Sequence, residues 1–467
     1  MANIFDRAGH SCATSGTGTL TLGSVLGAVA PNLCSFETFA NAGVQDQNIV
    51  SYLILDSNGA WETGWGIYTA SGTTLTRNVT KSSNSNAAIS LSGNEQVFVT
   101  MRAEDMATVE ALAAANIVIN GGMDVSQFNG ANSVSLVSGA NTYIVDQWVA
   151  SFTSASLVMA SQQVAPPGSP PFVGLQNCLQ LKATTGAALG TGDTAYLAAF
   201  IEGRRVARLG FGAAGASAVT VGFWVYATIA GTMTINYRND IASRSYLTNV
   251  TINNANTWQW VTVTIPGDVT GAWQTTSALA HIVLFCFGAG ATLQGTNNAW
   301  QAANVVGTSL TTNFFATTNN LVAITGAVLL PGAHQISQEQ APLLMRPFDT
   351  ELRLSERYYE KSYDYASLPG AVSTNGAAYN LLSNLPSNSH AGAIRCSFAS
   401  RKRAAPTMTF YSPVTGTSGK AADLTAAADV TASALGTGET GSYCTATSGA
   451  AQTTYSVNVQ WVADARL

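Results

Sequence analysis

Hydrophobic and polar residues alternate along much of the chain with the two-residue period of a β-strand. In the first hundred residues the alternation is seen at Thr17–Leu22, Tyr52–Leu55 and Gln96–Thr100. The tetrapeptide DSNG at Asp56–Gly59 precedes another strand-like run at Trp61–Tyr68 and is typical of a hairpin turn. Residues 1–102 are therefore predicted to form a small β-domain.

Residues 103–116 (AEDMATVEALAAAN) differ from the preceding sequence because they are rich in helix-forming residues. Met106, Val109, Leu112 and Ala113 share one face of the predicted helix. Helices of about 12–15 residues are marginal in water, so this connector needs a packing partner. We expect it either to dock on its own domain or to pack against copies of itself as a short trimeric neck.

Residues 117–361 form a long β-patterned region, and residues 362–467 begin with a loop-rich stretch before strand patterns return. The last two patterns are APTMTFYSP at Ala405–Pro413 and TYSVNVQWVADARL at Thr454–Leu467. Because the final pattern reaches the last residue, we expect this end of the chain to be part of a sheet.

The run TWQWVTVTI shows the alternation most clearly. One face carries the apolar residues Val261, Val263 and Ile265 and is predicted to line the core. The other face carries Trp258 and Trp260 with two threonines, which predicts either a half-exposed groove or a second buried layer. The run FWVY alternates likewise, with Phe223 and Val225 on one face and Trp224 and Tyr226 on the other.

Charge is sparse in this chain of 467 residues, since only 10% are Asp, Glu, Lys or Arg and the net charge is -5. Soluble domains average about 25% charged residues. The low and slightly acidic charge gives no indication of a nucleic-acid-binding surface, and it favours subunit association that covers surface. The segment Leu343–Lys361 is the exception, because it gathers eight charged residues and ends in paired tyrosines. The only basic cluster, Arg401–Arg403, is predicted to be a solvated turn.

Cysteine and histidine spacing gives no sign of a metal site. The six cysteines are scattered without a C-x-x-C pair, which argues against structural zinc and favours free thiols in a reducing compartment. Cys286, in the apolar run IVLFCF, is predicted to be a buried apolar residue. We expect no metal, no cofactor, no targeting segment and no membrane insertion.

Four segments near the N-terminus resemble a module found at the N-terminus of bacteriophage tail-fibre, neck and head-fibre proteins. They are ANIFDR (Ala2–Arg7), TSGTGTLTLG (Thr14–Gly23), WETGWGIYTASGTTLTR (Trp61–Arg77) and VFVTMRAED (Val97–Asp105). The resemblance implies a domain that attaches the protein to the virus particle.

Five further segments resemble the carbohydrate-binding-module-like jelly roll of such virion proteins. They are Ile119–Gln127, Thr142–Trp148, Phe200–Gly212 with Val221–Ala227, Thr257–Gly267 and the closing stretch Gly326–Lys361. That family has Arg between the Asp and Trp of the second segment, where this chain has Gln147. The resemblance therefore implies no role for this position that depends on arginine. Together the patterns and the resemblance predict an all-β protein with an N-terminal attachment domain (1–102), a helical connector (103–116), a jelly-roll β-sandwich (117–361) and a small C-terminal β-rich domain (362–467).

Motifs for catalysis are weak. The G-x-G-x-x-G at Gly210–Gly215 precedes a strand pattern rather than a helix, so it is interpreted as a turn and not a nucleotide site. Paired carboxylates could cleave glycosides, and the candidates in the β-region are Asp193, Glu202, Asp240 and Asp268. An ion pair of Glu202 with Arg204 or Arg208 is the simpler interpretation. No β-helix repeat of the kind found in depolymerase tailspikes is present. We expect a protein that is not an enzyme.

Aromatic residues are the better candidates for ligand binding, because sugar rings stack on exposed aromatic side chains. The candidates are Trp258, Trp260, Trp273 and Trp300. The function expected is that of a homotrimeric bacteriophage fibre protein, assembled in the host bacterial cytoplasm, carried on the virion with other virion proteins as partners, and binding host surface polysaccharide. The alternatives are a structural or decoration fibre without a receptor role and a glycan-degrading tailspike.

Overall fold

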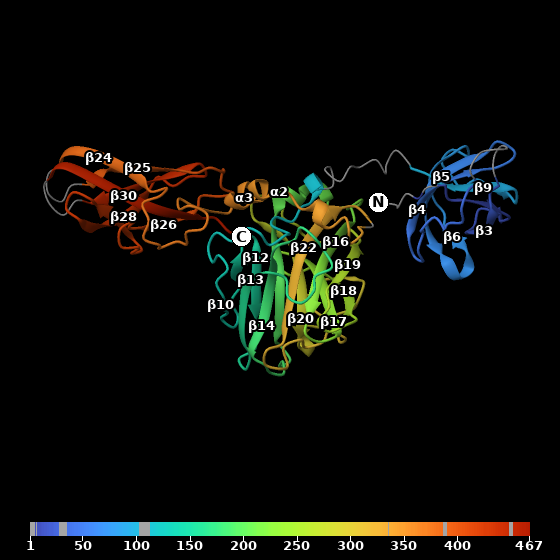
Figure 1. The fold of residues 1–467 in the computed structure, drawn as a ribbon, viewed down its shortest axis with the longest axis horizontal. Helices are drawn as coiled ribbons and strands as arrows, with labels where there is room; N and C mark the ends of the chain where they lie inside the picture. Colours follow the sequence, from blue (N-terminus) through green and yellow to red (C-terminus); the bar gives the residue numbers. More distant parts are fainter. Residues whose placement is uncertain are drawn as a thin grey trace. The chain divides into compact units, whose positions relative to one another are not determined.

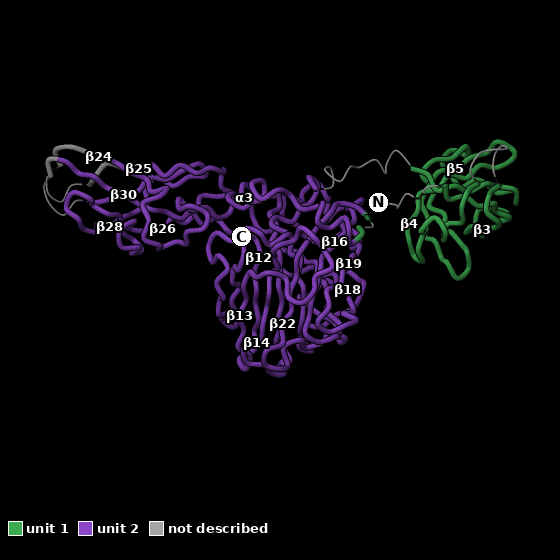
Figure 2. The backbone as a smooth tube through the Cα atoms, viewed as in Figure 1, with its two compact units in different colours: residues 1–112, 333–337 green, residues 113–332, 338–467 purple. Residues whose placement is uncertain are grey.

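The computed structural model describes residues 5, 7–27, 35–101, 113–334, 336–385, 390–447 and 452–467. The chain divides into two compact units. The first comprises residues 1–112 and 333–337, and the second comprises residues 113–332 and 338–467 (Figure 2). The predicted all-β class is confirmed, since the α-helices of the described residues are short and the sheets are extensive.

The first unit is built on a closed ring of antiparallel strands. β4 pairs with both β9 and β5, which closes the order β4-β9-β1-β3-β6-β5, and β7 is added on β5. A separate two-stranded ladder joins β2 and β8. The strands are β1 (Gly9–Cys12), β2 (Ser15–Gly16), β3 (Leu20–Val25), β4 (Ile49–Leu55), β5 (Trp61–Thr69), β6 (Thr74–Leu75), β7 (Asn78–Ser82), β8 (Leu91–Ser92) and β9 (Glu95–Val99), with the 3-10 turn η1 (Ala70–Gly72).

The predicted alternation produces the core of this unit. Val50, Tyr52 and Ile54 of β4 are fully buried, as are Leu20 of β3 and Val97 of β9. The predicted hairpin at residues 56–59 is confirmed, because the amide of residue 56 donates to the carbonyl of residue 60 and β4 pairs with β5 around it. Sequence period and turn chemistry therefore determine the local structure here.

The second unit begins with a β-sandwich of two antiparallel sheets. One sheet has the order β10-β13-β14-β22-β16-β19 and the other has the order β11-β12-β15-β20-β17-β18-β21. The strands of the first sheet are β10 (Val134–Ser135), β13 (Val158–Val164), β14 (Cys178–Thr185), β16 (Val219–Ala227), β19 (Gln259–Ile265) and β22 (Leu321–Pro331). Those of the second are β11 (Thr142–Val145), β12 (Trp148–Phe152), β15 (Thr194–Glu202), β17 (Gly231–Asn239), β18 (Ser245–Ile252), β20 (Leu279–Ala289) and β21 (Trp300–Gln301).

A single large core fills the space between the two sheets, and Phe223, Val225 and Phe285 are among its buried residues. Short helical segments lie in the loops: α2 (Gly203–Val206), η3 (Ala207–Leu209), η4 (Ala291–Leu293), η5 (Pro342–Leu344) and α3 (Phe348–Glu356). Figure 1 shows the long strands of the sandwich side by side, with α2 and α3 at one end of them. The charge-rich segment Leu343–Lys361 contains α3.

The C-terminal residues form an eight-stranded sheet around the long strand β30, which pairs with β23, β24, β26 and β27. Its strands are β23 (Tyr359–Lys361), β24 (Ala378–Leu385), β25 (His390–Ser397), β26 (Thr407–Tyr411), β27 (Lys420–Asp423), β28 (Ala428–Leu435), β29 (Gly441–Thr447) and β30 (Gln452–Asp464). The expectation that the end of the chain is part of a sheet is confirmed. β23 belongs to this sheet although it lies within the range predicted for the sandwich.

Residues 103–112 of the predicted helical connector lie outside the described residues, while residues 113–115 are helical. Immediately after them, the side chain of Asn116 accepts a hydrogen bond from the amide of Leu329 in β22 at 3.0 Å. The amide of Ile117 also donates to the carbonyl of Leu329. The chain therefore enters the sandwich already bonded to β22.

Candidate functional site

The four candidate tryptophans fall into two separate groups. Trp258 and Trp260 lie on the outer face of the six-stranded sheet, at or just before β19. Trp273 and Trp300 come together elsewhere, with ring centroids 5.7 Å apart at an interplanar angle of 87°. The structure therefore places Trp258 near Trp260 and Trp273 near Trp300, but it does not bring all four into one site.

Trp258 belongs to a second buried layer. Only 5% of it is exposed, and its indole N–H donates to the carbonyl of Pro167 at 2.8 Å. Phe172, from the loop between β13 and β14, covers it at a ring distance of 5.3 Å. An indole buried in this way is a packing residue, because neither its face nor its N–H is available to a ligand.

Trp260 is half-buried, and its ring lies 5.6 Å from that of the buried Trp224. Further along β19, Thr262 is half-buried and Thr264 is exposed, whereas Val261 and Ile265 on the opposite face are buried in the core. The predicted division of the two faces is thus confirmed. The outer face changes from a second buried layer at Trp258 to an open surface at Thr264.

Trp273 and Trp300 belong to an aromatic cluster at the loop end of the sandwich, and both are half-buried. Phe211 touches both rings edge-on, at 4.9 Å and 6.0 Å. Phe211 comes from the Gly210–Gly215 motif, so the interpretation of that motif as a turn is correct: it carries an aromatic side chain into the cluster and leads into β16. Beneath lie Tyr237 and His281, joined by a 2.7 Å hydrogen bond between the Tyr hydroxyl and Nδ1 of the His.

An ion pair with a buried carboxylate borders this cluster. Arg244 donates two hydrogen bonds of 2.7 Å to Asp268, and its guanidinium lies 5.9 Å from the centroid of the Trp300 ring. Burial disfavours the charge on Asp268, but hydrogen bonds from Arg244 and Thr270 outweigh it and hold its pKa below the usual value. An ionised carboxylate with two strong donors is poorly suited to act as a general acid.

The indole N–H groups of the pair are occupied. Trp300 donates to the carbonyl of Pro266 at 2.9 Å, and Trp273 donates to Asp268 and to the carbonyl of Thr270, each at 3.2 Å. What the two residues can still offer a ligand is the exposed part of their ring surface. That surface is suited to stacking against the apolar face of a sugar ring and not to hydrogen bonding.

The other candidate carboxylates are Asp193, Asp240 and Glu202. Asp193 accepts the amide of Gly190 at 2.8 Å, and Asp240 lies in the loop after β17. The predicted pairing of Glu202 with Arg204 or Arg208 is wrong. Its partner is Arg357, which donates two hydrogen bonds of 2.9 and 2.7 Å, and the hydroxyl of Tyr358 adds a third at 2.7 Å.

The true partner of Glu202 reveals the role of the charge-rich closing segment. Burial disfavours ionisation of Glu202, but the donors from residues 357 and 358 hold its pKa below the usual value. Within the same segment, Arg346 pairs with Glu351 at 3.0 Å. Glu360 of the segment pairs with the fully buried Lys402, which lies outside it. The charges of this segment therefore tie the sandwich to the C-terminal sheet.

The prediction that the basic cluster at residues 401–403 is a solvated turn is also wrong. Lys402 is 0% exposed, and Arg403 donates to the carbonyls of Ser277 and Arg466 at 3.1 and 2.6 Å. Only Arg401 is exposed, where it pairs with Glu439. The prediction of a solvated turn failed because the partners lie far away in the sequence.

Gln147, at the position where the similar family has arginine, occupies the turn between β11 and β12 with a backbone φ of 70°. It is buried, and its Nε2 has no hydrogen-bond partner among the described residues. The side chain lies too deep to take part in a surface site. It is a packing residue here.

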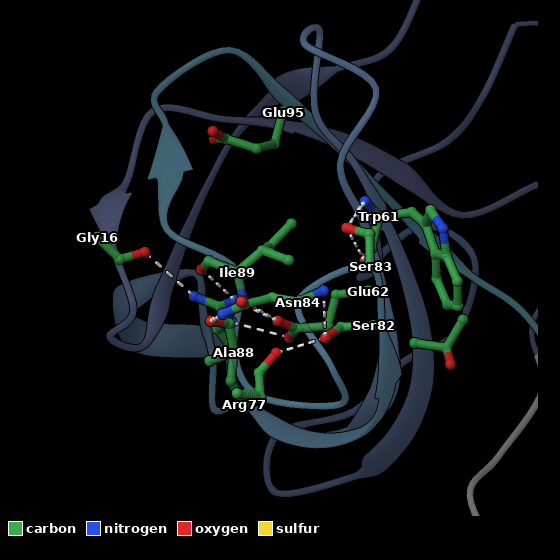
Figure 3. Close-up of polar contacts among 12 residues, drawn as sticks. Gly16, Trp61, Glu62, Arg77, Ser82, Ser83, Asn84, Ala88, Ile89 and Glu95 are labelled. Carbon is green, nitrogen blue, oxygen red and sulfur yellow. Dashed lines mark hydrogen bonds and ion pairs between the residues drawn. The ribbon is translucent and has the colours of Figure 1, made fainter.

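In the first unit, the most prominent polar site is formed by the two ends of the motif at Trp61–Arg77. Figure 3 shows Glu62 and Arg77 facing one another, with Arg77 also donating to the carbonyls of Gly16 and Ile89 at 3.3 and 3.0 Å. Both side chains are buried, and Glu62 accepts a further hydrogen bond from the hydroxyl of Tyr52 at 2.8 Å. Its oxygens are thus satisfied inside the ring of strands, which makes this pair structural.

The described residues contain neither a metal-ligand cluster nor a membrane-spanning helix. No group of three His, Cys, Asp or Glu side chains there is arranged to hold a metal ion, and no helix there is long and apolar enough to cross a bilayer. The cysteines at positions 12, 178, 286, 396 and 444 are buried free thiols, as predicted for Cys286, while Cys34 lies outside the described residues.

No model of a known protein family matches the sequence. No curated protein matches it either. Among solved structures, the chain is similar to the enzymatically active domain of tailspike protein 4 of bacteriophage CBA120, with 12% identity and a TM-score of 0.22, over 47% of this chain and 22% of that one. It is also similar to a family 4 carbohydrate-binding module, with 11% identity and a TM-score of 0.25, over 46% and 99% of the two chains.

A third similar structure is the family 11 carbohydrate-binding module from Clostridium thermocellum in complex with a β-1,3-1,4-mixed-linked tetrasaccharide. Its identity is 11% and its TM-score is 0.21, over 44% of this chain and 99% of that one. This chain thus spans about a fifth of the length of the tailspike protein and nearly all of the two modules. TM-scores this low carry no argument about family, ligand or activity.

Proposed function

We propose that the chain is a bacteriophage virion fibre protein that is attached to the particle by its N-terminal unit and binds host surface glycan through the β-sandwich. The sequence resemblance to virion proteins supports the virion role. The observation that carries glycan binding is the half-exposed pair Trp273 and Trp300 beside the Arg244–Asp268 ion pair. Aromatic surface bordered by fixed polar groups is what a sugar ring requires.

In this proposal the protein binds glycan and does not cleave it. Two of the four candidate carboxylates are held by arginine, which leaves them without the proton that a glycosidase acid must donate. A homotrimer is part of the proposal, on the basis of the sparse charge and the resemblance to fibre proteins. Light scattering at micromolar concentration tests it: a mass three times that of the chain supports the trimer, and a monomer contradicts it.

A decoration fibre without a receptor role is the second candidate. The observation in its favour is that the indole N–H groups of Trp258, Trp273 and Trp300 are all bonded within the protein. Residues that only close the end of a core would look the same. The two functions differ in whether the exposed ring surface contacts a ligand.

A glycan array probed with the full-length protein separates these functions. We expect binding to a defined set of glycans, strong loss of binding in Trp300→Ala, and partial retention in Trp300→Phe, which keeps a ring. Tyr379→Ala is the matched control, because Tyr379 is an aromatic residue that is 55% exposed in β24. Binding that survives Trp300→Ala, or a folded protein that binds no glycan, contradicts the proposed site.

A further inference from the structure

A hollow lies on the C-terminal sheet, and none of the four candidate tryptophans lines it. It has a volume of about 590 Å³. Pockets of about 300–1,000 Å³ are the usual size for small-molecule sites. It is lined by Phe128, Tyr359, Arg403, Ala404, Ala405, Thr407, Thr409, Tyr411, Val462, Asp464, Ala465 and Arg466.

A row of polar side chains from three strands lines this hollow. In the register of the sheet, Asp464 of β30 is paired with Tyr359 of β23 on one side and with Thr407 of β26 on the other. Directly paired residues of antiparallel strands project to the same face. The sheet thus places a carboxylate between two hydroxyl-bearing side chains.

Strand β26 extends this row because its sequence, TMTFY, alternates. Thr407, Thr409 and Tyr411 all line the hollow, whereas Phe410 on the other face is 3% exposed and packs in the core of the sheet. Thr409 and Tyr411 are half-buried, and Thr407 is exposed. Hydroxyl groups repeated along one open strand face can bond to a ligand that itself carries many hydroxyls.

Arg466 connects several of the side chains around the hollow. Arg466 is paired with Asp464 at 2.5 Å, and its guanidinium lies 5.1, 4.7 and 4.9 Å from the ring centroids of Phe128, Tyr143 and Tyr359. Although Phe128 is part of this arrangement, 43% of it is exposed. An aromatic ring held in place at the rim offers a stacking surface at little cost in side-chain entropy.

Two polar groups here are not fully used by the protein. Arg403 donates to the carbonyls of Ala465, Ser277 and Arg466, and no carboxylate partner is found for it among the described residues. A guanidinium has five N–H donors, so donors and an uncompensated positive charge remain. The hydroxyl of Tyr359 is buried without a hydrogen-bond partner among the described residues.

We propose that this hollow is a second binding site and that its ligand is an anionic saccharide. The hydroxyls of Thr407, Thr409 and Tyr411 and the carboxylate of Asp464 bond to sugar hydroxyls. The ring of Phe128 contacts the apolar face of the sugar, and Arg403 pairs with the acidic group. The site is separate from the one proposed on the sandwich and does not depend on it.

Titration calorimetry of the full-length protein with trigalacturonic acid, and with its uncharged methyl ester, tests this site. We expect the acid to bind with a dissociation constant of about 1 mM or tighter and the ester to bind about tenfold more weakly. Phe128→Ala and Thr409→Val should each weaken the acid about tenfold without lowering the melting temperature, since neither residue is buried. Arg403→Met should reduce the affinity for the acid to that for the ester.

Trp300→Ala is the control, and it should leave the affinity for trigalacturonic acid unchanged. The site is refuted if neither compound binds up to about 10 mM, or if the Phe128 and Thr409 variants bind like the wild type. If Trp300→Ala alone removes binding, the hollow is refuted while the proposed sandwich site stands. If only the Phe128 and Thr409 variants lose affinity for trigalacturonic acid, the binding site in the hollow is supported. That result is independent of the outcome of the glycan array.

Discussion

The few charged residues of this protein include several that form ion pairs inside the fold. Several ion pairs among the described residues have a buried carboxylate and connect separate elements of the chain, as Glu62 does with Arg77 and Glu202 does with Arg357. The presence of these residues was visible in the sequence, but their partners were not. Glu202 and Arg357 are 155 positions apart, so neighbouring arginines offered the more obvious but incorrect pairing.

The buried pair Glu62–Arg77 should be much more important to stability than an exposed pair in the same unit. Glu62→Ala leaves Arg77 buried without a counter-charge, which should lower the free energy of unfolding by about 3–5 kcal/mol. Glu37→Ala removes the exposed partner of Arg7 and should cost about 1 kcal/mol or less. Urea unfolding of the separately expressed residues 1–112 measures both, and equal effects would contradict the structural role of Glu62.

His281 should make stability depend on pH. Burial lowers its pKa from 6.5 to about 3, so the folded state keeps the ring neutral while the unfolded state binds a proton. The stability that this group contributes is therefore present above pH 6.5 and is lost as the pH falls towards 3, by about 1.4 kcal/mol per pH unit.

Comparison of the wild type with His281→Gln isolates this effect. The comparison is needed because Asp146, whose pKa is raised to about 6 by burial, changes stability in the opposite direction over part of the range. Its stabilising contribution is complete below about pH 4 and is lost as the pH rises through 6. Denaturation curves between pH 7 and 4 should show a stability difference that narrows as the pH falls, and a constant difference would contradict the neutral buried ring.

At the scale of the elements, the sequence predicted strands better than it predicted how they associate. The period of two correctly divided β19 into a core face and an outer face, and the DSNG turn correctly gave the first hairpin. The hollow on the C-terminal sheet could not be predicted, because Tyr359, Thr407 and Asp464 become neighbours only through the register of three strands. The one available signal was the alternation of hydroxyl-bearing residues in TMTFY.

Strand β30 should be indispensable to the C-terminal sheet, since it pairs with four other strands. Val459→Asp buries a carboxylate in the core of that sheet, where the valine is 0% exposed, and should unfold it. Val372→Asp makes the same change at a position that is 66% exposed and should be tolerated. Hydrogen exchange should show lost protection in residues 394–467 of the first variant only. Lost protection throughout the sandwich as well would contradict a separate C-terminal core.

At the scale of the whole molecule, the chain consists of two compact units with separate hydrophobic cores. The first unit carries the motifs that resemble a virion-attachment module, and the second carries the half-exposed tryptophans and the hollow. We therefore propose a division of labour in which attachment and recognition reside in different units. The sequence indicated this division through the change to helix-forming residues at 103–116, of which 103–112 lie outside the described residues.

The most direct test of the central claim is a glycan array probed with residues 1–112 and residues 113–467 expressed separately. The account predicts that residues 113–467 reproduce the binding pattern of the full-length protein and that residues 1–112 bind no glycan. Glycan binding by residues 1–112, or its absence from a folded 113–467, would contradict the proposal that the unit containing the sandwich recognises the host surface.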